Sequence, residues 1–565
     1  MNSFKKIQKA IEEVAGSDVS FALTTTEEIS HGDYATNVAF ICGKRENISP
    51  KEYAERVRGV LLEKASDCVS DIQIAGPGFI NFFLKDEVRT HEAFMYLSEN
   101  AFARENRREV IVEYTDPNPF KLFHIGHLVP NAIGEAIARI YEAQGNKVTR
   151  ICYQGDVGMH VAKAIYGFLK RREEENVSGF LPTVGAWESY IHKAYAYGNE
   201  LYEKDDSSRV EIQNINKHVY LKDNQVINQY YEEGKKWSLD YFETVYKKLG
   251  TKFDHYIMES EVSEHGKEIV KKFLGTVFEE SEGAIVYKGE KVGLHTRVFV
   301  NKEGLPTYEA KELGNTYKKK EFVPNATESI VVSGNEIDEY FKVIKAALSE
   351  IDKPLADSIK HISHGMLRLP EGKMSSRTGN VIPAEDLINK VKEHIQEKIG
   401  ESKKEGTLSD ELLTAVAVGS IKFAILKSAP GKDMIFDFEK SLSFEGDSGP
   451  YLQYTHARLC ALLEKGKVIT GEHSAYKGVP EKELEQVISR YPLVLDKAYK
   501  EIGPHHIVGY LLLLTRVFNS MYARVQIIDI NDQDKSTYYI ALAQATKNIL
   551  AQGLHVLGIA APERM

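Results

Sequence analysis

The stretch of sequence that decides the fold is residues 109–127, which read Glu-Val-Ile-Val-Glu-Tyr-Thr-Asp-Pro-Asn-Pro-Phe-Lys-Leu-Phe-His-Ile-Gly-His. Its apolar start, residues 109–114, predicts a strand, and the apolar periodicity of residues 125–143 predicts a helix. Residues 147–153 then predict a second strand. Strand, turn, helix and strand in this order open a parallel α/β sheet, whose ligands bind at the turns where strands end.

The turn before this helix ends in the motif His124-Ile125-Gly126-His127. Two histidines at a helix N-terminus can donate to phosphate oxygens, and the helix dipole favours negative charge there. We expect Gly126 to leave room for the approach of a nucleotide. The alternative is that both histidines are ordinary loop residues.

A second motif, Lys373-Met374-Ser375-Ser376-Arg377, follows a strand predicted over residues 361–369. A glycine-flanked loop with cations and hydroxyls can close over a triphosphate, although alone it would equally fit a solvated basic turn. Together the two motifs predict an ATP site that reacts at the α-phosphate, where the protein aligns a carboxylate and stabilises charge as pyrophosphate leaves. We expect catalysis from His124, Gly126, His127, Lys373, Met374 and Ser375, and ATP binding by His124, His127, Lys373, Ser375 and Ser376.

Composition sets the limits on class and location. The chain has 565 residues, 42% of them hydrophobic, which suggests three or four domains. A net charge of −10 argues against indiscriminate coating of nucleic acid but leaves room for a local basic groove. The four isolated cysteines predict neither a disulfide framework nor a structural zinc site. No secretory signal or membrane span is evident, so we expect a soluble cytoplasmic protein.

The pattern along the chain divides it into four parts. Residues 1–105 predict a small α+β domain, and residues 106–380 a Rossmann-type parallel-sheet catalytic domain with a helical insertion at about 161–250. Residues 381–445 form a linker, and residues 446–565 predict an all-α bundle. The further strands are predicted at 283–287, 295–300, 329–333 and 361–369, and the later helices at 411–427, 453–464, 481–499, 505–525 and 537–557.

The two motifs are signatures of class I aminoacyl-tRNA synthetases, and the sequence around them resembles arginyl-tRNA synthetases. The matching blocks are residues 116–124, 155–158, 448–458 and 558–565, together with 32–37 and 76–81 near the start. The resemblance therefore runs from end to end. It implies an arginine–tRNA ligase that uses ATP with Mg²⁺ to form arginyl-adenylate and passes the arginyl group to the terminal adenosine of tRNA(Arg). It further implies a monomer, and a first step that can itself require bound tRNA.

The resemblance also assigns a role to a lysine ahead of the first motif. The second motif of the class usually carries another lysine where this chain has Ser376. In arginyl enzymes that lysine is often absent, and a lysine three residues before the first histidine is thought to substitute for it. Lys121 fits this role, because one extra cation is needed near the phosphates and either loop can provide it.

Recognition of arginine requires a carboxylate in a fixed planar geometry, because the guanidinium offers a rigid fork of donors. The resemblance points to Glu113, Asn118, Tyr308 and the acid four residues later. That acid is Glu312, where the family more often has Asp, so the charge is kept but displaced by about one methylene. His160 and Gln154, which flank the Gly-Asp block, are further candidates. A pocket that reads charge rejects apolar amino acids by itself, so we expect no editing activity.

Residues that would bind tRNA are inferred from the same resemblance. Aromatic and basic side chains of the bundle can stack on and hold unpaired anticodon bases, although many aromatics of a bundle are simply core. The candidates are Tyr451, Tyr454, Arg458, Asn519 and Tyr522 in the bundle, the terminal Met565, and Phe79 and Asn81 in the first domain.

Three other functions remain open. A catalytically silent paralogue that binds tRNA would be expected to lose the histidines or Lys373, and this chain keeps them. A nucleotidylyltransferase also uses His-x-Gly-His but is usually shorter and lacks a helical tail. Another class I synthetase, such as the cysteinyl enzyme, would be expected to carry zinc-ligand cysteines.

Overall fold

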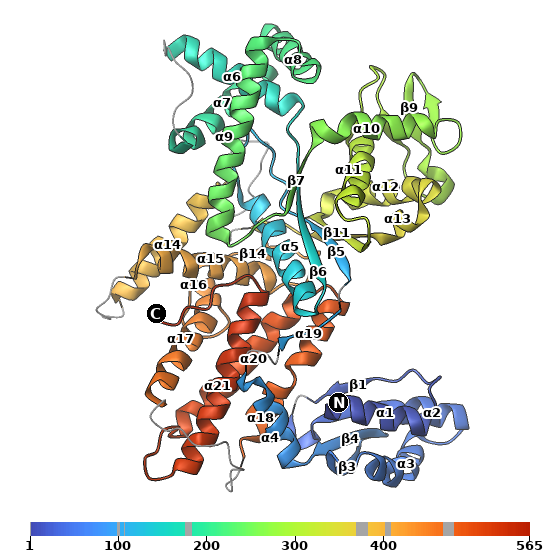
Figure 1. The fold of residues 1–565 in the computed structure, drawn as a ribbon, viewed down its shortest axis with the longest axis vertical. Helices are drawn as coiled ribbons and strands as arrows, with labels where there is room; N and C mark the ends of the chain where they lie inside the picture. Colours follow the sequence, from blue (N-terminus) through green and yellow to red (C-terminus); the bar gives the residue numbers. More distant parts are fainter. Residues whose placement is uncertain are drawn as a thin grey trace.

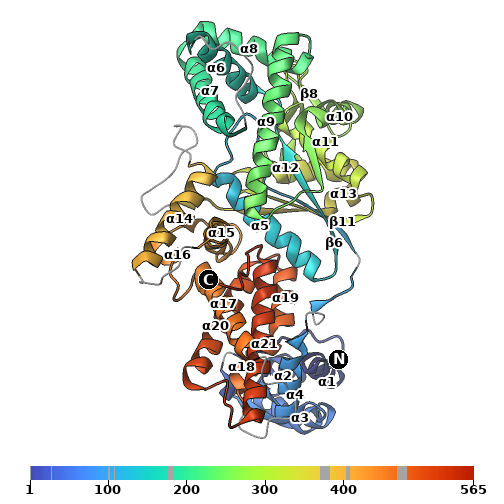
Figure 2. The same cartoon turned by 60° about the vertical axis from the view of Figure 1, so that its left-hand side comes forward.

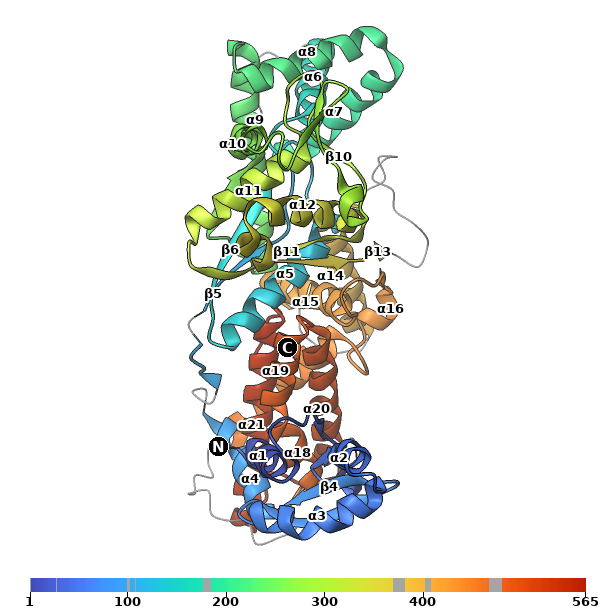
Figure 3. The ribbon, with the colours of Figure 1, turned by 90° about the vertical axis from the view of Figure 1, so that its right-hand side faces the viewer.

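The molecule is elongated, with a helical insertion at one end, the N-terminal domain at the other and the parallel sheet between them (Figures 1 and 2). The N-terminal domain lies beside the C-terminal bundle (Figure 3). The computed structural model describes residues 2–26, 28–98, 102–106, 108–175, 184–368, 382–401, 408–466 and 480–565.

The central sheet has five parallel strands, in the spatial order β12-β11-β5-β6-β7. They are β5 (Glu109–Glu113), β6 (Lys147–Gln154), β7 (His255–Met258), β11 (Ala326–Gly334) and β12 (Ile359–His364). The chain builds outward from β5 to β7 and then returns to the other side of β5. The order therefore reverses between β5 and β11, and a ligand crevice is expected outside the carboxyl ends of these two strands.

Helices cover both faces of this sheet. On one face α5 (Ile125–Ala143) connects β5 to β6, and Val110, Val112 and Cys152 pack into the large core beneath it. On the other face Ile111, Ile151 and Ile257 pack with residues of α10 (Glu259–Lys272) and the segment after α11 (Tyr308–Phe322). Alternation of side chains along the strands therefore sends Glu113, two residues after Ile111, toward α11.

The strands predicted at 109–114, 147–153 and 329–333 are confirmed as β5, β6 and β11. The single strand predicted at 361–369 is wrong in its extent: β12 ends at His364, and the separate β13 (Leu367–Arg368) pairs with β14 (Met434–Ile435). The runs at 283–287 and 295–300 are strands, but they form a small antiparallel sheet with β8. Its members are β8 (Glu279–Ser281), β9 (Ala284–Tyr287) and β10 (Arg297–Val300).

The insertion between β6 and β7 is helical, as the sequence predicts. It consists of α6 (Met159–Glu175), α7 (Val184–Lys204), α8 (Asp206–Leu221) and α9 (Gln225–Leu249). The fully buried Asp156 joins it to the sheet, because its carboxylate accepts from Tyr231 (2.6 Å) and Lys235 (2.7 Å) of α9 and from the hydroxyl of Ser260 on α10 (2.7 Å). Burial of a charge is tolerated when it is paired and hydrogen-bonded in this way.

The N-terminal domain packs helices on an antiparallel sheet of order β1-β2-β4-β3. Strands β3 and β4 form a hairpin that turns at Gly76 and Gly78, which both have positive φ. The elements are β1 (Leu23–Thr25), β2 (Tyr34–Thr36), β3 (Val69–Ala75) and β4 (Phe79–Leu84), with α1 (Ser3–Ala15), α2 (Val38–Glu46), α3 (Pro50–Lys64) and α4 (Asp86–Phe94).

The C-terminal part is built from helices. The helix predicted at 481–499 is wrong as a single element, because α18 ends at Ser489 and α19 restarts at Tyr491 with Pro492 in its first turn, where no backbone donor is needed. The helices after the sheet are α14 (Ala384–Glu401), α15 (Asp410–Leu426), α16 (Phe438–Ser441), α17 (Gly449–Gly466), α18 (Lys482–Ser489), α19 (Tyr491–Lys500), α20 (His505–Arg524) and α21 (Gln533–Val556). Completing the helices are α12 (Asp338–Ile351), α13 (Lys353–Ser358) and the 3₁₀ turns η1 (Ile29–His31), η2 (Met95–Leu97), η4 (Gly289–Val292) and η5 (Asn335–Ile337).

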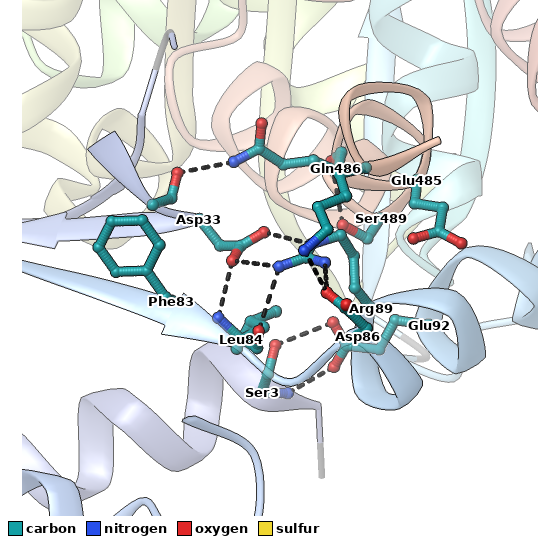
Figure 4. A network of polar contacts seen from close by, with 12 residues as sticks. Ser3, Asp33, Phe83, Leu84, Asp86, Arg89, Glu92, Glu485, Gln486 and Ser489 are labelled. Carbon is teal, nitrogen blue, oxygen red and sulfur yellow. Dashed lines mark hydrogen bonds and ion pairs between the residues drawn. The ribbon is translucent and has the colours of Figure 1, made fainter. Parts of the chain in front are cut away.

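A buried polar network joins the N-terminal domain to the bundle (Figure 4). Arg89 and Asp33, each 3% exposed, form a two-bond ion pair at 2.8 and 3.0 Å. Beside it, the amide of Gln486 on α18 donates to the carbonyl of Gly32 at 2.8 Å, and Arg490 donates to the carbonyl of Thr26. The loop from Thr26 to Asp33 is therefore held from both domains.

Among the residues that the structure describes, no helix combines the length and the apolar character that a membrane span requires. The same residues contain no group of three or more His, Cys, Asp or Glu side chains that could hold a metal ion.

Candidate active site

The two motif histidines lie at the first turn of α5, at the carboxyl end of β5. The Nδ1 atom of His124 accepts from the backbone of Gly126 (3.0 Å), and Nδ1 of His127 accepts from the backbone of His124 (3.2 Å). The two rings stack with their centroids 3.9 Å apart. Each histidine thus caps the helix with one nitrogen, which satisfies backbone donors that the helix itself leaves unpaired.

These bonds fix the tautomer of both rings. A nitrogen that accepts from a backbone N–H carries no proton, so a neutral ring must carry its proton on Nε2. Burial and the nearby ammonium of Lys121 lower the pKa of His124 to about 4. Burial, followed by the neighbouring His124, lowers the pKa of His127 well below its ordinary value. At neutral pH the pair therefore presents two uncharged Nε2–H donors.

The structure gives Gly126 a steric role in addition to the predicted one, which stays a prediction. A Cβ at this position would lie 2.7 Å from Cε1 and 2.9 Å from Nδ1 of His124. Glycine is therefore needed so that the His124 ring can fold back onto the helix N-terminus, and this steric reason is independent of any nucleotide.

Lys121 lies close to the histidines and contacts the insertion. Its ammonium is 5.3 Å from the ring centroid of Tyr195 on α7, within cation–π range. Burial and the neighbouring Lys163 lower the pKa of Lys121 from its ordinary value. In the described residues no carboxylate lies within ion-pair distance of Lys121.

Lys373, Met374, Ser375 and Ser376 lie outside the described residues. The described chain resumes at Ile382, whose carbonyl accepts from the backbone of Ile125 (3.2 Å), and Ala384 donates to the carbonyl of Phe123 (2.9 Å). The residues that follow the second motif are therefore hydrogen-bonded to the residues of the first.

The predicted amino-acid site lies on the other side of the end of β5. Glu113 (2% exposed) and Glu312 of α11 (5% exposed) share one donor: Nδ2 of Asn315 lies 3.0 Å from Oε2 of Glu113 and 3.4 Å from Oε1 of Glu312. Asn118 accepts from the backbone of Gly155 at 3.1 Å. Tyr308, one helical turn before Glu312, is 67% exposed and lies at the start of α11. The contacts thus bring Glu113 and Glu312 together through Asn315, while Asn118 lies beside the end of β6 and Tyr308 lies at the first residue of α11.

His160 and Gln154 lie near the same strand ends. The Nε2 atom of His160 is 2.9 Å from the carbonyl of Gly155, and burial together with Lys121 lowers the pKa of His160 to about 3, so the ring is neutral. Gln154 is fully buried, and neither its amide nitrogen nor its amide oxygen has a partner among the described residues. It is on the same face of β6 as Cys152, which faces α9 and not α11.

The sequence analysis missed several groups of the amino-acid site. Lys319 (2% exposed) forms ion pairs with Glu113 (3.0 Å) and Glu312 (3.7 Å). The buried hydroxyl of Tyr153 has no partner among the described residues. One available signal was the spacing of Glu312, Asn315 and Lys319, which places all three on one face of α11.

The site carries more buried acid than base. Burial raises the pKa of Glu312 to about 8, with Lys319 opposing and Glu113 reinforcing the shift. Burial, followed by Glu113, raises the pKa of Asp116 well above its ordinary value. A ligand that brings a positive charge would therefore favour the ionised carboxylates.

Comparisons with known proteins identify the family. The family model "tRNA synthetases class I (R), catalytic domain" matches residues 93–438, "DALR anticodon binding domain" matches 452–565, and "Arginyl tRNA synthetase N terminal domain" matches 3–84. The chain belongs to the arginyl-tRNA synthetase family. Among its relatives, the arginine–tRNA ligase of Flavobacterium psychrophilum is 30% identical over 92% of this chain and 90% of its own, and that of Clostridioides difficile 28% over 99% and 98%.

Solved structures show the same fold. The arginyl-tRNA synthetase of Thermus thermophilus superposes with a TM-score of 0.83 at 24% identity, covering 100% of this chain and 99% of that one. The arginyl-tRNA synthetase of Plasmodium falciparum gives 0.79 at 19%, covering 100% and 98%. As a class I synthetase of the arginine type, the chain is an arginine–tRNA ligase and an ATP-using enzyme.

Within the anticodon-binding domain of this synthetase, four predicted residues form two pairs between α17 and α20. The guanidinium of Arg458 lies 4.1 Å from the ring centroid of Tyr522, and Nδ2 of Asn519 donates to the hydroxyl of Tyr451 at 2.9 Å. Arg458 is exposed, whereas the others are half-buried. Tyr454 is half-buried and lies edge-on to Phe444 with the ring centroids 6.3 Å apart.

The remaining predicted tRNA residues differ in exposure. Phe79 is 45% exposed at the start of β4 and contacts the ring of Phe40, whereas Asn81 is 6% exposed. Met565 is half-buried against the bundle core. Of these three, Phe79 offers the largest surface for a base to stack on.

Proposed function

We propose that this synthetase activates L-arginine with ATP at the carboxyl end of β5 and transfers it to tRNA(Arg). The observation that carries the proposal is the pair of buried acids, Glu113 and Glu312, on one side of that strand end, with the neutral pair His124 and His127 on the other. A cationic side chain in the acidic pocket would direct its own carboxylate toward a phosphate bound at the helix N-terminus.

On the nucleotide side, the Nε2–H groups of His124 and His127 donate to phosphate oxygens, and the N-terminus of α5 adds its dipole. Neutral donors suit this task because they need no proton transfer during the reaction. Lys121 supplies a positive charge, as does Lys373, which with Met374, Ser375 and Ser376 is assigned from the sequence. Mg²⁺ would arrive on the phosphates of ATP, in keeping with its preference for oxygen ligands.

On the amino-acid side, Glu113 and Glu312 each offer a carboxylate oxygen to the guanidinium. Asn118, held by Gly155, lies where it reaches the amino-acid backbone, and Tyr308 closes the pocket from its rim. His160 lies close to Lys121 and connects the nucleotide side of the site to the amino-acid side. Gln154 faces α9, so we assign it to the insertion side of the site.

For tRNA, we propose that the bundle of residues 446–565 holds the anticodon through Tyr451, Tyr454, Arg458, Asn519, Tyr522 and Met565. We propose that residues 1–105 contact the body of the tRNA through Phe79, with Asn81 supporting the strand. Residues 381–445 connect the bundle to the catalytic part at 106–380 and contact the stem of the tRNA. One monomer would span the whole tRNA.

The test is ATP–pyrophosphate exchange with each of the twenty amino acids, with and without total tRNA. Exchange with arginine alone, rising when tRNA is added, is the expected result. Exchange with another amino acid would refute the assignment of the acidic pocket. No exchange from a folded sample with Mg²⁺ and tRNA would favour a silent tRNA-binding paralogue. Glu113→Gln, which keeps the shape of the pocket, should lose arginine-dependent exchange, whereas Glu279→Gln on the exposed β8 should not.

A further inference from the structure

A lysine of the protein itself lies directly against the two acids of the amino-acid pocket. Lys319 is 2% exposed, and its ammonium is 3.0 Å from Oε2 of Glu113 and 3.7 Å from Oε1 of Glu312. Asn315, fully buried on the same face of α11, donates to the same two oxygens. Within the described residues no group donates to the other oxygen of either acid.

Among the described residues, no other acid lies within ion-pair distance of the Lys319 ammonium. On its far side lies a cavity of about 200 Å³ between α11, α13 and the sheet, whose walls contain no acid. Two hydroxyls in that wall, of Thr316 and Ser329, are buried without a partner among the described residues. Lys320, also in the wall, pairs with Asp352 at 3.0 Å. The positive charge of Lys319 is therefore compensated by the acids of the amino-acid pocket.

Neighbouring buried acids are each matched by their own base. Glu259 pairs with Lys311 at 2.8 Å, and Glu309 pairs with Arg297 at 3.1 Å. By contrast, Glu113 and Glu312, with Asp116 close by, have Lys319 as their one base within ion-pair distance among the described residues. A buried charge without a partner costs free energy. These acids therefore have too little positive charge beside them until a cationic ligand binds.

We propose that Lys319, assisted by Asn315, is a positioning residue: it holds one oxygen of Glu113 and one of Glu312 from behind, so that the remaining oxygen of each faces the guanidinium of the substrate. Lys319 favours the ionised forms of the two acids and holds the pair aligned, but it does not neutralise the pair fully. The pocket then accepts a cation and disfavours a neutral isostere of arginine. This inference rests on the proposed arginine site.

Protonation of the acids supplies the readout. Burial raises the pKa of Glu312 to about 8, and Lys319 acts against that rise. Burial alone would lower the pKa of Lys319, but Glu113 and Glu312 raise it above its ordinary value, so it stays charged. The ionisable groups that face the acid pair are Asp116 and Tyr153 at the strand ends, Glu259 on α10, Lys311 and Lys319 on α11, and Tyr340 on α12.

The experiment measures aminoacylation by the full chain with saturating ATP and tRNA, as a function of arginine concentration and pH. Removing an opposite charge at this distance raises a carboxyl pKa by ~1–3 units. Lys319→Met and Lys319→Gln should therefore raise KM for arginine ~10-fold or more at pH 7 with a smaller change in kcat, and the fall of KM with rising pH should continue to a higher pH than in the wild type. If the Lys319 variants were instead unfolded, raising the pH would not restore a low KM for arginine.

The matched control is Lys422→Met, which removes another buried lysine, on α15, away from the amino-acid pocket. It should leave KM for arginine and its pH profile unchanged. An unchanged arginine KM and profile in both Lys319 variants, with an active wild type, would overturn the inference while leaving the proposed function intact. A wild type that charges no arginine would instead refute the proposed function.

A measurement on the wild type is independent of any variant. Calorimetry of arginine binding to the complex with tRNA, in two buffers of different ionisation enthalpy, counts protons exchanged. Net proton release at pH 7 that disappears by pH 9 is expected if the acid pair lacks positive charge before arginine binds. No proton release at pH 7 would overturn the inference, because the acids beside Lys319 would then not lack positive charge before arginine binds.

Discussion

Replacement of Arg89 by methionine should loosen the N-terminal domain. The guanidinium makes two bonds to Asp33 (2.8 and 3.0 Å), one to Asp86 (2.8 Å) and one to the carbonyl of Leu84 (3.1 Å). In Arg89→Met the carboxylate of Asp33, 3% exposed, keeps only the backbone donor of Leu84 at 2.8 Å. Removing one partner of a buried pair costs about 3–5 kcal/mol.

Hydrogen exchange of the full chain measures this loss locally. Because 1.4 kcal/mol corresponds to a factor of ten, the amides of β2 and β4 should exchange ~100- to 4,000-fold faster in Arg89→Met. The control is Arg56→Met on α3, whose pair with Glu46 is solvent-exposed and should contribute less than about 1 kcal/mol. Equal exchange rates in both variants would refute the reasoning, since the buried and the exposed ion pair would then contribute equally to stability.

The same variant should affect one substrate and not another. Asp33 ends the loop whose carbonyls at Thr26 and Gly32 accept from Arg490 and Gln486 of the bundle, so loosening Asp33 weakens the junction in Figure 4. The KM for tRNA should rise several-fold, and the KM for arginine should stay constant. A rise of both together would point to general unfolding.

Three further outcomes follow from single contacts. His124→Ala should lower kcat ~100-fold, because it removes one fixed hydrogen-bond donor. Burial lowers the pKa of His124 to about 4, so wild-type kcat at saturating arginine should show no inflection from histidine titration between pH 6 and 9. Gly155→Ala would place a Cβ 2.4 Å from Oδ1 of Asn118, so KM for arginine should rise ~10–100-fold with almost no change in the melting temperature. An unchanged KM would show that Asn118 does not take part in binding arginine. Lys422→Met leaves the carbonyls of residues 249 and 558 without their donor and should cost about 2–5 kcal/mol in chemical denaturation. Because burial lowers the pKa of Lys422 to about 8 from 10.5, the unfolded state binds more protons between these values, so wild-type stability should rise with pH there and the variant should lack that slope.

The parallel sheet was predictable from the sequence because its signals are local. The β5–α5–β6 unit is continuous in sequence, and its apolar periods change from strand to helix within a few residues. The break after β12 was not predictable, since β13 pairs with β14 more than sixty residues later and no local signal reports such a partner. The break at Arg490 had a signal in Pro492, which favours the first turn of a new helix.

Within the site, residue types were predictable but their partners were not. The sequence places the imidazoles of His124 and His127 at a helix start, yet only the geometry shows that each uses Nδ1 on the backbone and so presents Nε2–H. Gly126 is expected to make room for a ligand, and the structure adds that a side chain there would meet the ring of His124. A motif thus identifies the groups, and the fold decides which of their atoms remain available.

Lys319 shows why the remainder of such a site escapes sequence analysis. A lysine among the four of residues 311–320 in a surface-like helix is typical of a solvated face, and nothing in its neighbours distinguishes it. It is buried because α11 lies on the face of the sheet toward which Glu113 points, and that pairing joins positions two hundred residues apart. Two acids brought together by such a fold need a fixed cation whose positive charge only partly neutralises them. Full neutralisation would leave no electrostatic reason to bind arginine. One lysine shared by Glu113 and Glu312 meets that condition.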